Sequence, residues 1–100
     1  MTVYQDLSTI KNALLTKIEQ HSNKEQLNIT IQVEEYEFGS DTVVLLFDGN
    51  GLLLLDMTYT ENHITTSQAT AKARELHVSV MDWVTDCNVD VNEKIKEVCY

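Results

Sequence analysis

The stretch of sequence from Leu27 to Thr60, LNITIQVEEYEFGSDTVVLLFDGNGLLLLDMTYT, decides the fold of this chain. Apolar and polar residues alternate strictly from Leu27 to Val33, which predicts a strand with one buried face. After that point the apolar positions move to Tyr36 and Phe38, so the alternation shifts by one residue at Glu34-Glu35. We explain this shift by a one-residue β-bulge.

Two groups of turn residues divide the rest of the stretch into strands. Gly39-Ser40-Asp41 predicts a first turn, and Asp48-Gly49-Asn50-Gly51 is a strong hairpin signal. Residues 42–47 between them are apolar on both faces, and residues 52–60 form a third strand. An antiparallel three-stranded meander is the simplest assembly of these strands. One face of the third strand carries Leu53, Leu55, Met57 and Tyr59.

Helices are predicted on both sides of the three strands. Residues 3–21 form the first helix, and Thr2 with Gln5 fits a capping box at its start. The second helix covers residues 68–87, with Ser67 as its N-cap, and a short third helix follows it. The fold class is therefore α+β, with the order α-β-β-β-α-α in a single compact domain over residues 1–100.

The inward faces of these helices are defined by apolar residues at helical spacing. In the short third helix, capped by Asn92 or Asp90, Ile95 and Val98 face inward. The stripes of the two long helices consist of Val3, Leu7, Ile10, Leu14 and Ile18, and of Ala69, Ala73, Leu76, Val80, Trp83, Val84 and Cys87.

The predicted sheet has one face that a single layer of helices covers and one face that it leaves open. On the open face, polar residues of the first strand would lie beside Leu52, Leu54 and Asp56. A mixture of leucines and carboxylates is suited to docking a partner. In the alternative arrangement, the terminal helices cover both faces and no open face exists.

Most of the excess charge of the chain belongs to the predicted sheet. The 100 residues contain 16 acidic and 7 basic side chains, which gives a formal charge of −9. The stretch from Glu25 to Ala71 holds eight acidic residues and no Lys or Arg, a net charge of −8. Such a chain is not expected to grip a nucleic-acid backbone or an anionic membrane. Because carboxylates on adjacent strands repel one another, the layout opposes the compact state.

Three explanations compete for this charge. A solvated acidic face would keep the protein soluble. Clustered carboxylates would bind a divalent cation, although Asp48-Gly49-Asn50-Gly51 lacks the alternating ligands of an EF-hand loop. The third explanation, which we favour, is docking onto a basic groove of another protein, where carboxylates take the positions of phosphates. The residues expected to make this contact are Glu34, Glu35, Glu37, Asp41, Asp48, Asp56 and Glu61, with Leu52 and Leu54 as apolar anchors.

This explanation predicts a small, non-catalytic inhibitor that blocks the nucleic-acid-binding site of a nuclease or a related protein. Anti-CRISPR and anti-restriction factors of phages act in this way, and an immunity protein for a nuclease toxin would make the same contact. The expected partner is a basic protein, with no direct contact to nucleic acid or to a membrane. Two hypotheses of other classes stay open: an oligomeric structural module, a homodimer included, and an enzyme with an unrecognised pocket.

The sequence carries no recognisable catalytic or metal-binding signature. A zinc site would need His63, His77, Cys87 and Cys99 to converge in three dimensions, and their spacing does not indicate it. We therefore expect no catalytic residues, no metal and no cofactor. The start of the chain lacks the basic and apolar segments of a secretion signal, so we expect a cytosolic protein with free cysteines.

The predicted order of elements resembles that of double-stranded-RNA-binding domains. In the run Ser67-Gln68-Ala69-Thr70-Ala71-Lys72-Ala73-Arg74, the basic residues lie early in the second long helix, where that family holds phosphates. The resemblance implies RNA binding through this helix. The sequence departs from the family at Gln68 and Ala69, where a lysine pair is expected, and at the acidic turn Gly39-Ser40-Asp41. Acidic secretion chaperones also begin α-β-β-β-α, but a chain that ends in a short helix lacks their further strands.

Overall fold

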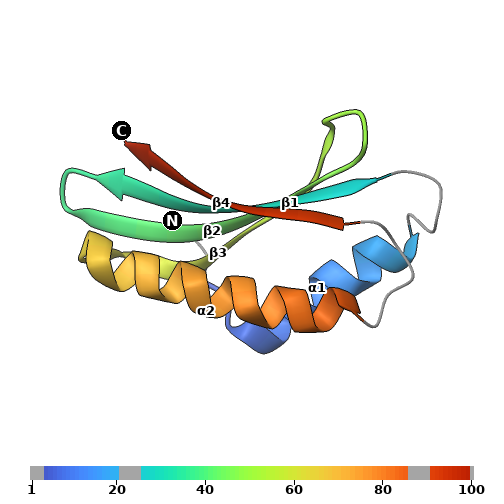
Figure 1. Cartoon of the computed structure of the whole chain (residues 1–100). Helices are drawn as coiled ribbons and strands as arrows, with labels where there is room; N and C mark the ends of the chain where they lie inside the picture. The colour runs from blue at the N-terminus through green and yellow to red at the C-terminus, as the bar shows by residue number, and fades with distance from the viewer. Residues whose placement is uncertain (1–3, 21–25, 86–90, 100) are drawn as a thin grey trace.

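Four strands form one mixed sheet in the computed structural model, which describes residues 4–20, 26–85 and 91–99. Across the sheet the order is β3 (Leu53–Ile64), β2 (Gly39–Phe47), β1 (Leu27–Tyr36) and β4 (Val91–Cys99) (Figure 1). β2 pairs antiparallel with both β1 and β3, whereas β4 pairs parallel with β1. The α+β class is confirmed, but the sheet has four strands and is not purely antiparallel.

The fourth strand replaces the short C-terminal helix that the sequence analysis predicted. It pairs with β1 without interruption, from Leu27 opposite Val91 to Glu35 opposite Cys99. Its apolar residues Val91, Ile95 and Val98 have helical spacing, yet an edge strand needs few apolar residues and is protected by charged ones. The prediction that Ile95 and Val98 share one inward face is wrong, because side chains alternate along a strand.

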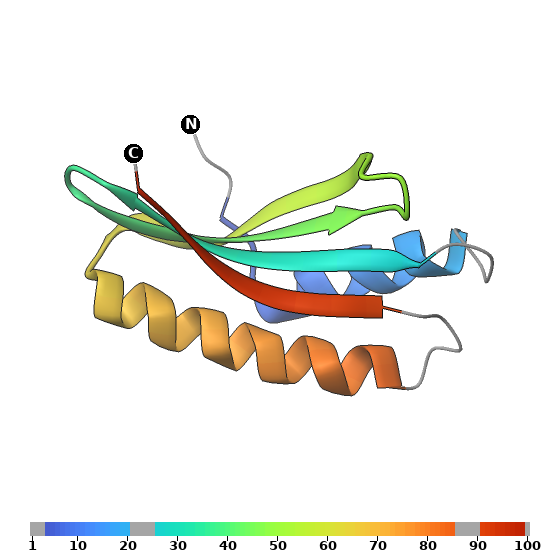
Figure 2. The same ribbon diagram turned by 45° about the horizontal axis from the view of Figure 1, so that its top comes forward.

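Both helices, α1 (Leu7–Gln20) and α2 (Thr66–Thr85), pack on the same face of the sheet (Figures 1 and 2). The observed order is therefore α-β-β-β-α-β. The arrangement with helices on both faces is wrong for the part of the chain that the structure describes. The other face of the sheet is open there. The secretion-chaperone topology was set aside because a helical C-terminus was expected. Since residues 91–99 form a strand, that reason no longer holds.

The first turns of the two helices are capped differently from the sequence predictions. α1 begins at Leu7 instead of residue 3, and the Oδ1 atom of Asp6 accepts a hydrogen bond from the Thr9 backbone N at 2.8 Å. Asp6 is therefore its N-cap, and the predicted cap Thr2 lies outside the described residues.

The N-cap of α2 is Thr65 instead of Ser67. The Oγ1 atom of Thr65 accepts a hydrogen bond from the Gln68 backbone N at 3.2 Å. In return, the Gln68 Oε1 atom accepts one from the Thr65 backbone N at 2.9 Å. These reciprocal bonds form a capping box and fix the start of α2 at Thr66.

The hydrophobic core fills the space between the helices and the covered face of the sheet. Small residues let α2 lie close to β2, where the Thr42 Oγ1 atom donates a hydrogen bond to the Ala69 carbonyl at 3.0 Å. Leu7, Trp83 and Val84 are only partly buried, and Val3 and Cys87 lie outside the described residues. The remaining stripe residues are confirmed as core: Ile10, Leu14 and Ile18 of α1, and Ala69, Ala73, Leu76 and Val80 of α2, against Leu27, Ile29, Ile31 and Val33 of β1.

The turn between β1 and β2 is earlier in the chain than predicted. Tyr36 pairs with Gly39, so the turn consists of Glu37 and Phe38, and Gly39-Ser40-Asp41 belongs to β2. The register of β1 on β2 is continuous, so the bulge predicted at Glu34-Glu35 does not occur. The apparent shift arose because Tyr36 and Phe38 are exposed and never belong to the core face.

The irregular strand pairing lies between β2 and β3 instead. One register shift falls between Leu46 and Phe47, and Phe47 then pairs with Leu53. This shift moves Leu53 to the open face, where 46% of it is exposed. The predicted inward face of the third strand is therefore correct for Leu55, Met57 and Tyr59, which pack in the core, and wrong for Leu53.

Candidate protein-binding surface

The open face of the sheet carries charges of both signs. The parallel pairing places Lys94 opposite Thr30, and the same row continues through Leu45 to Asp56 on β3. Lys96 lies one step further along β4, opposite Gln32, and both lysines are exposed. The acidic surface that we expected over the whole sheet is therefore interrupted by β4, which brings two cations onto the same face.

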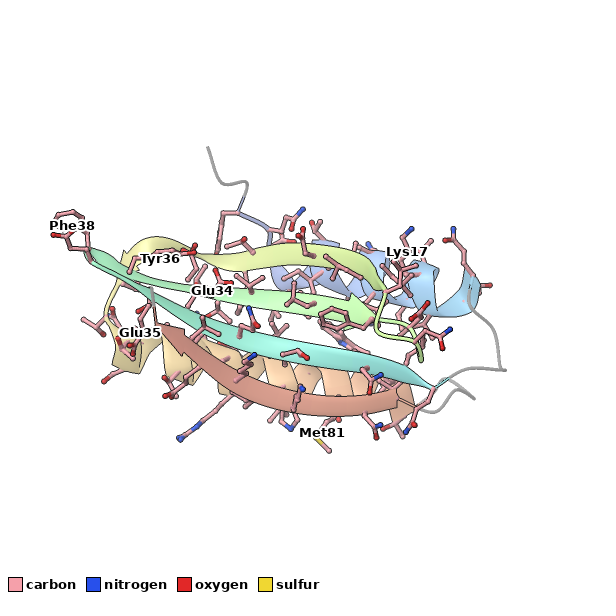
Figure 3. All side chains as sticks on the ribbon, turned by 90° about the horizontal axis from the view of Figure 1, so that it is seen from above. Lys17, Glu34, Glu35, Tyr36, Phe38 and Met81 are labelled. Carbon is pink, nitrogen blue, oxygen red and sulfur yellow. The ribbon has the colours of Figure 1, made fainter. Side chains whose placement is uncertain are left out.

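Acidic side chains gather where β1 turns into β2. We call Glu34, Glu35, Tyr36, Glu37 and Phe38 the acidic hairpin end (Figure 3). The carboxylate of Glu34 lies on the open face and accepts two hydrogen bonds there. One comes from the Tyr36 hydroxyl at 2.7 Å, and the other comes from Gln32 Nε2 at 3.0 Å.

The carboxylates of the acidic hairpin end point to both sides of the sheet. Glu35 pairs with Ser40, whose hydroxyl oxygen lies 3.2 Å from that of Thr66 in the first turn of α2. Glu35 is thus on the helix side, Glu34 is on the open side, and Glu37 lies between them in the turn. A partner that surrounds the tip would meet negative charge from each side.

An aromatic ring occupies the tip itself. Phe38 is 84% exposed, more than the other large apolar side chains of the described residues, and lies at the far end of the molecule (Figure 3). Aromatic side chains that become buried on association supply much of the binding energy of protein interfaces. Phe38 was not among the predicted contact residues, because the pattern of apolar positions placed it in the first strand. The available signal was the break in alternation after Val33, which a protruding turn explains better than a bulge.

Two of the predicted acidic contact residues are buried. Asp48 is 8% exposed, and its Oδ1 atom accepts hydrogen bonds from the backbone N atoms of Asn50 at 2.8 Å and Leu52 at 2.9 Å. These bonds close the loop between β2 and β3. Asp41 is 4% exposed and lies opposite Glu34 in β2. Both carboxylates are therefore largely inaccessible to a partner.

The other predicted contact residues are separated from the acidic hairpin end. Asp56 is exposed on β3, and Leu52 is exposed in the loop before it. Leu54 packs partly against the core, so it is a poor apolar anchor. Glu61 belongs to β3, but its side chain lies outside the described part of the structure. The structure therefore brings together Glu34, Glu35 and Glu37, with the buried Asp41 paired beside Glu34, and leaves the remaining candidates elsewhere.

A second pair of ionisable side chains lies between α2 and β4. The Nδ1 atom of His77 is 3.2 Å from the Oε2 atom of Glu93, and the Glu93 side chain is 9% exposed. Burial raises the pKa of Glu93, and the attraction of His77 partly opposes this rise. No group of three or more metal-ligating side chains forms among the described residues. The side chains of His63, Cys87 and Cys99 lie outside them, so the zinc hypothesis stays untested.

The basic residues of α2 that the RNA-binding resemblance would use are in different surroundings. Lys72 Nζ lies 3.6 Å from Glu75 and 5.9 Å from the centre of the Tyr59 ring. Glu75 also accepts a hydrogen bond from the Tyr59 hydroxyl at 3.3 Å. Burial and this carboxylate together raise the pKa of Tyr59 to about 12. Lys72 is thus held by a local cluster, whereas Arg74 is exposed.

A hollow of about 250 Å³ lies on the open face beside the loop between β2 and β3. Asn28, Thr30, Phe47, Asn92 and Lys94 line it. The amide groups in it bond to each other, since Asn92 Nδ2 donates to Asn28 Oδ1 at 3.4 Å. This lining contains no Ser, Cys or His that could serve as a nucleophile or as an imidazole base.

No helix in the described part of the chain is both long enough and apolar enough to cross a membrane. Compared with known proteins, the sequence matches no family model, and the chain matches no curated protein and no solved structure.

Proposed function

We propose that this protein is a non-catalytic inhibitor that inserts its acidic hairpin end into a basic, nucleic-acid-binding site of another protein. One observation carries the proposal: the exposed ring of Phe38 lies at the tip of the hairpin, and Glu34, Glu35 and Glu37 follow behind it in the turn and the strand end. The hairpin belongs to a stretch without Lys or Arg, from Glu25 to Ala71.

The spacing of these carboxylates suits a groove that normally binds phosphates. Glu35 lies near the end of β1 and Glu37 lies in the turn, two residues on, so their Cα atoms are at most about 7 Å apart. A groove lined with Lys and Arg can form charge-assisted hydrogen bonds to carboxylates as it does to phosphates. Because the two proteins would carry opposite charges at the contact, they should associate rapidly, and the complex should weaken as the salt concentration rises.

The exposed ring gives the hairpin a second likeness to nucleic acid. Proteins that bind single strands combine a cationic groove with apolar or aromatic positions on which bases stack. Phe38 is placed ahead of the carboxylates, where it can enter such a position while they meet the cations. A phage counter-defence factor of the anti-CRISPR or anti-restriction type and an immunity protein for a nuclease toxin both require this contact, so the proposal covers both.

The test compares two double variants with the same change in net charge. Glu35→Lys with Glu37→Lys reverses the acidic hairpin end, whereas Glu19→Lys with Asp56→Lys reverses two exposed acidic residues on α1 and β3, away from that end. A partner captured at low salt from a host-cell lysate is purified, and its affinity is measured for each variant. We expect the hairpin variant to lose about a hundredfold or more in affinity, and the control to bind nearly as well as the wild type.

A competition experiment then asks whether the contact blocks nucleic acid. A labelled single-stranded oligonucleotide bound to the purified partner should be displaced by the wild type, and not by the hairpin variant. Equal loss of affinity in both double variants contradicts the proposed site. Simultaneous binding of the oligonucleotide and the wild type contradicts the proposed mode of inhibition.

A further inference from the structure

The face of α2 that points away from the sheet carries exposed apolar side chains. Val78 is 60% exposed and Met81 is 51% exposed. With 3.6 residues per turn, Val78 lies on the side opposite the buried stripe of the helix. Ala71 and Thr85 lie seven residues before and after it on the same side, and both are exposed. This spacing is the one that two packed helices use at their contact.

Two opposite charges lie on this outward face at equal distances from Val78. Arg74 precedes it by four residues, and Asp82 follows it by four residues. Both side chains are exposed, and neither belongs to an ion pair within residues 4–20, 26–85 and 91–99. Along the helix axis the two residues are about 12 Å apart, too far to reach each other directly.

We propose that two copies of this chain associate through α2, antiparallel and related by a two-fold axis at Val78. In this arrangement Val78 meets its own counterpart, and Arg74 of each copy lies opposite Asp82 of the other. Both ion pairs arise from the symmetry alone, which is the self-complementarity that an interface between identical copies requires. A different partner would need a separately matched pattern. In antiparallel packing the two helix dipoles also point in opposite directions, which is electrostatically favourable.

The side chains around the axis support close packing. Ala71 and Thr85 are small and would lie opposite each other across the axis, so the helices can approach. Met81 provides flexible apolar cover beside Val78. One helix face buries less area than a standard interface, so the dimer is weak and reversible and forms as the protein concentration rises.

This inference does not depend on the proposed function. The outward face of α2 points away from the sheet, and the acidic hairpin end lies at the end of the molecule (Figures 1 and 3). Both surfaces can therefore be occupied at once, and a dimer would present two acidic hairpin ends.

Sedimentation velocity over a range of protein concentrations tests the dimer. We expect the wild type to move from 11.4 kDa toward twice that mass as concentration rises. Val78→Asp places two carboxylates against each other on the axis and should weaken association at least about tenfold. The matched control is Leu52→Asp, at a position that is 63% exposed on the loop between β2 and β3, and it should dimerise as the wild type does.

Exchanging the charges of Arg74 and Asp82 shows whether these two residues pair across the dimer or whether a substitution weakens association only by destabilising the helix. Arg74→Asp and Asp82→Arg each place like charges opposite one another, so each should weaken the dimer. The variant with both substitutions restores opposite charges and should regain most of the association. Helix content by circular dichroism should stay constant throughout. A monomeric wild type at all concentrations overturns the proposal, and so does a double variant that associates no better than the single ones.

Discussion

Asp48 was expected to be a surface contact residue, but its buried carboxylate instead holds the loop between β2 and β3. Its Oδ1 atom accepts hydrogen bonds from two backbone N atoms of the following loop, at 2.8 and 2.9 Å. Asp48→Ala leaves both donors without this acceptor, so we expect a loss of about 1–2 kcal/mol in the free energy of unfolding. Urea denaturation followed by circular dichroism measures this loss.

Two control variants show whether the loop bonds are the cause. Asp48→Asn keeps an Oδ1 acceptor and should lose much less stability. Asp56→Ala removes an exposed carboxylate from β3 and should change stability little. If Asp48→Ala is as stable as Asp56→Ala, the carboxylate does not hold the loop.

Glu93 is a residue whose environment makes stability depend on pH. Burial raises its pKa above the ordinary value of 4.5, and the attraction of His77 only partly opposes this. The folded state therefore binds the proton more tightly than the unfolded state does. The stabilising contribution is complete below about pH 4.5 and is lost as the pH rises through the pKa of the folded state. Because glutamine does not ionise, Glu93→Gln should escape this loss.

The measurement is the free energy of unfolding of Glu93→Gln minus that of the wild type, determined from acidic to neutral pH. We expect this difference to increase with pH. Glu97→Gln is the matched control, because Glu97 lies four residues further along β4, on the same side of the strand, and is exposed. Its difference from the wild type should be nearly constant. A difference that falls with pH would mean that the ionised form of Glu93 stabilises the folded state, contrary to this expectation.

At the scale of an element, the start of α2 depends on the capping box between Thr65 and Gln68. Thr65→Ala removes the side-chain acceptor for the Gln68 backbone N, and we expect a loss of about 1 kcal/mol in the free energy of unfolding. Ser67, which the sequence analysis took for the cap, lies inside the helix, so Ser67→Ala should cost little or even stabilise. Urea denaturation of the two variants distinguishes the assignments. Equal losses would show that the box does not control the start of α2.

The elements that the sequence predicted correctly are those with a buried side. The stripes of α1 and α2 and the alternation of β1 follow directly from burial against a core. β4 escaped prediction because it lies at the edge of the sheet, where Asn92, Lys94 and Lys96 face solvent and the apolar residues are sparse. What makes it a strand is the free edge of β1, and a pairing of residues this far apart in sequence has no local signature.

At the scale of the whole molecule, the sequence shows where the acidic residues lie along the chain, but it did not predict where they lie in space. Burial removed Asp41 and Asp48 from the surface, and β4 placed Lys94 and Lys96 on the open face. The acidic hairpin end kept three of the expected acidic residues together, because a protruding turn has few neighbours that could bury or neutralise them. The candidate site was thus predictable in composition, whereas its shape and its aromatic tip depended on tertiary structure.

The same surplus of charge should make salt act in opposite directions on folding and on binding. At a formal charge of −9, self-repulsion destabilises the free protein, so added salt should raise its free energy of unfolding. The proposed contact with a basic partner would be attractive, so the same salt should weaken it. Urea denaturation and affinity measurements at low and at about 0.5 M NaCl, where the screening length falls below about 5 Å, test both effects.

The hairpin variant provides the internal control for this opposition. Glu35→Lys with Glu37→Lys changes the formal charge from −9 to −5, because each substitution adds two charges. Its stability should therefore rise less with salt than that of the wild type, and its residual binding should depend less on salt. If salt leaves the stability of the wild type unchanged while binding still weakens, repulsion among the acidic side chains does not measurably destabilise the folded monomer. The negative potential would then be confined to the hairpin tip, and a single groove on the partner would suffice to neutralise it.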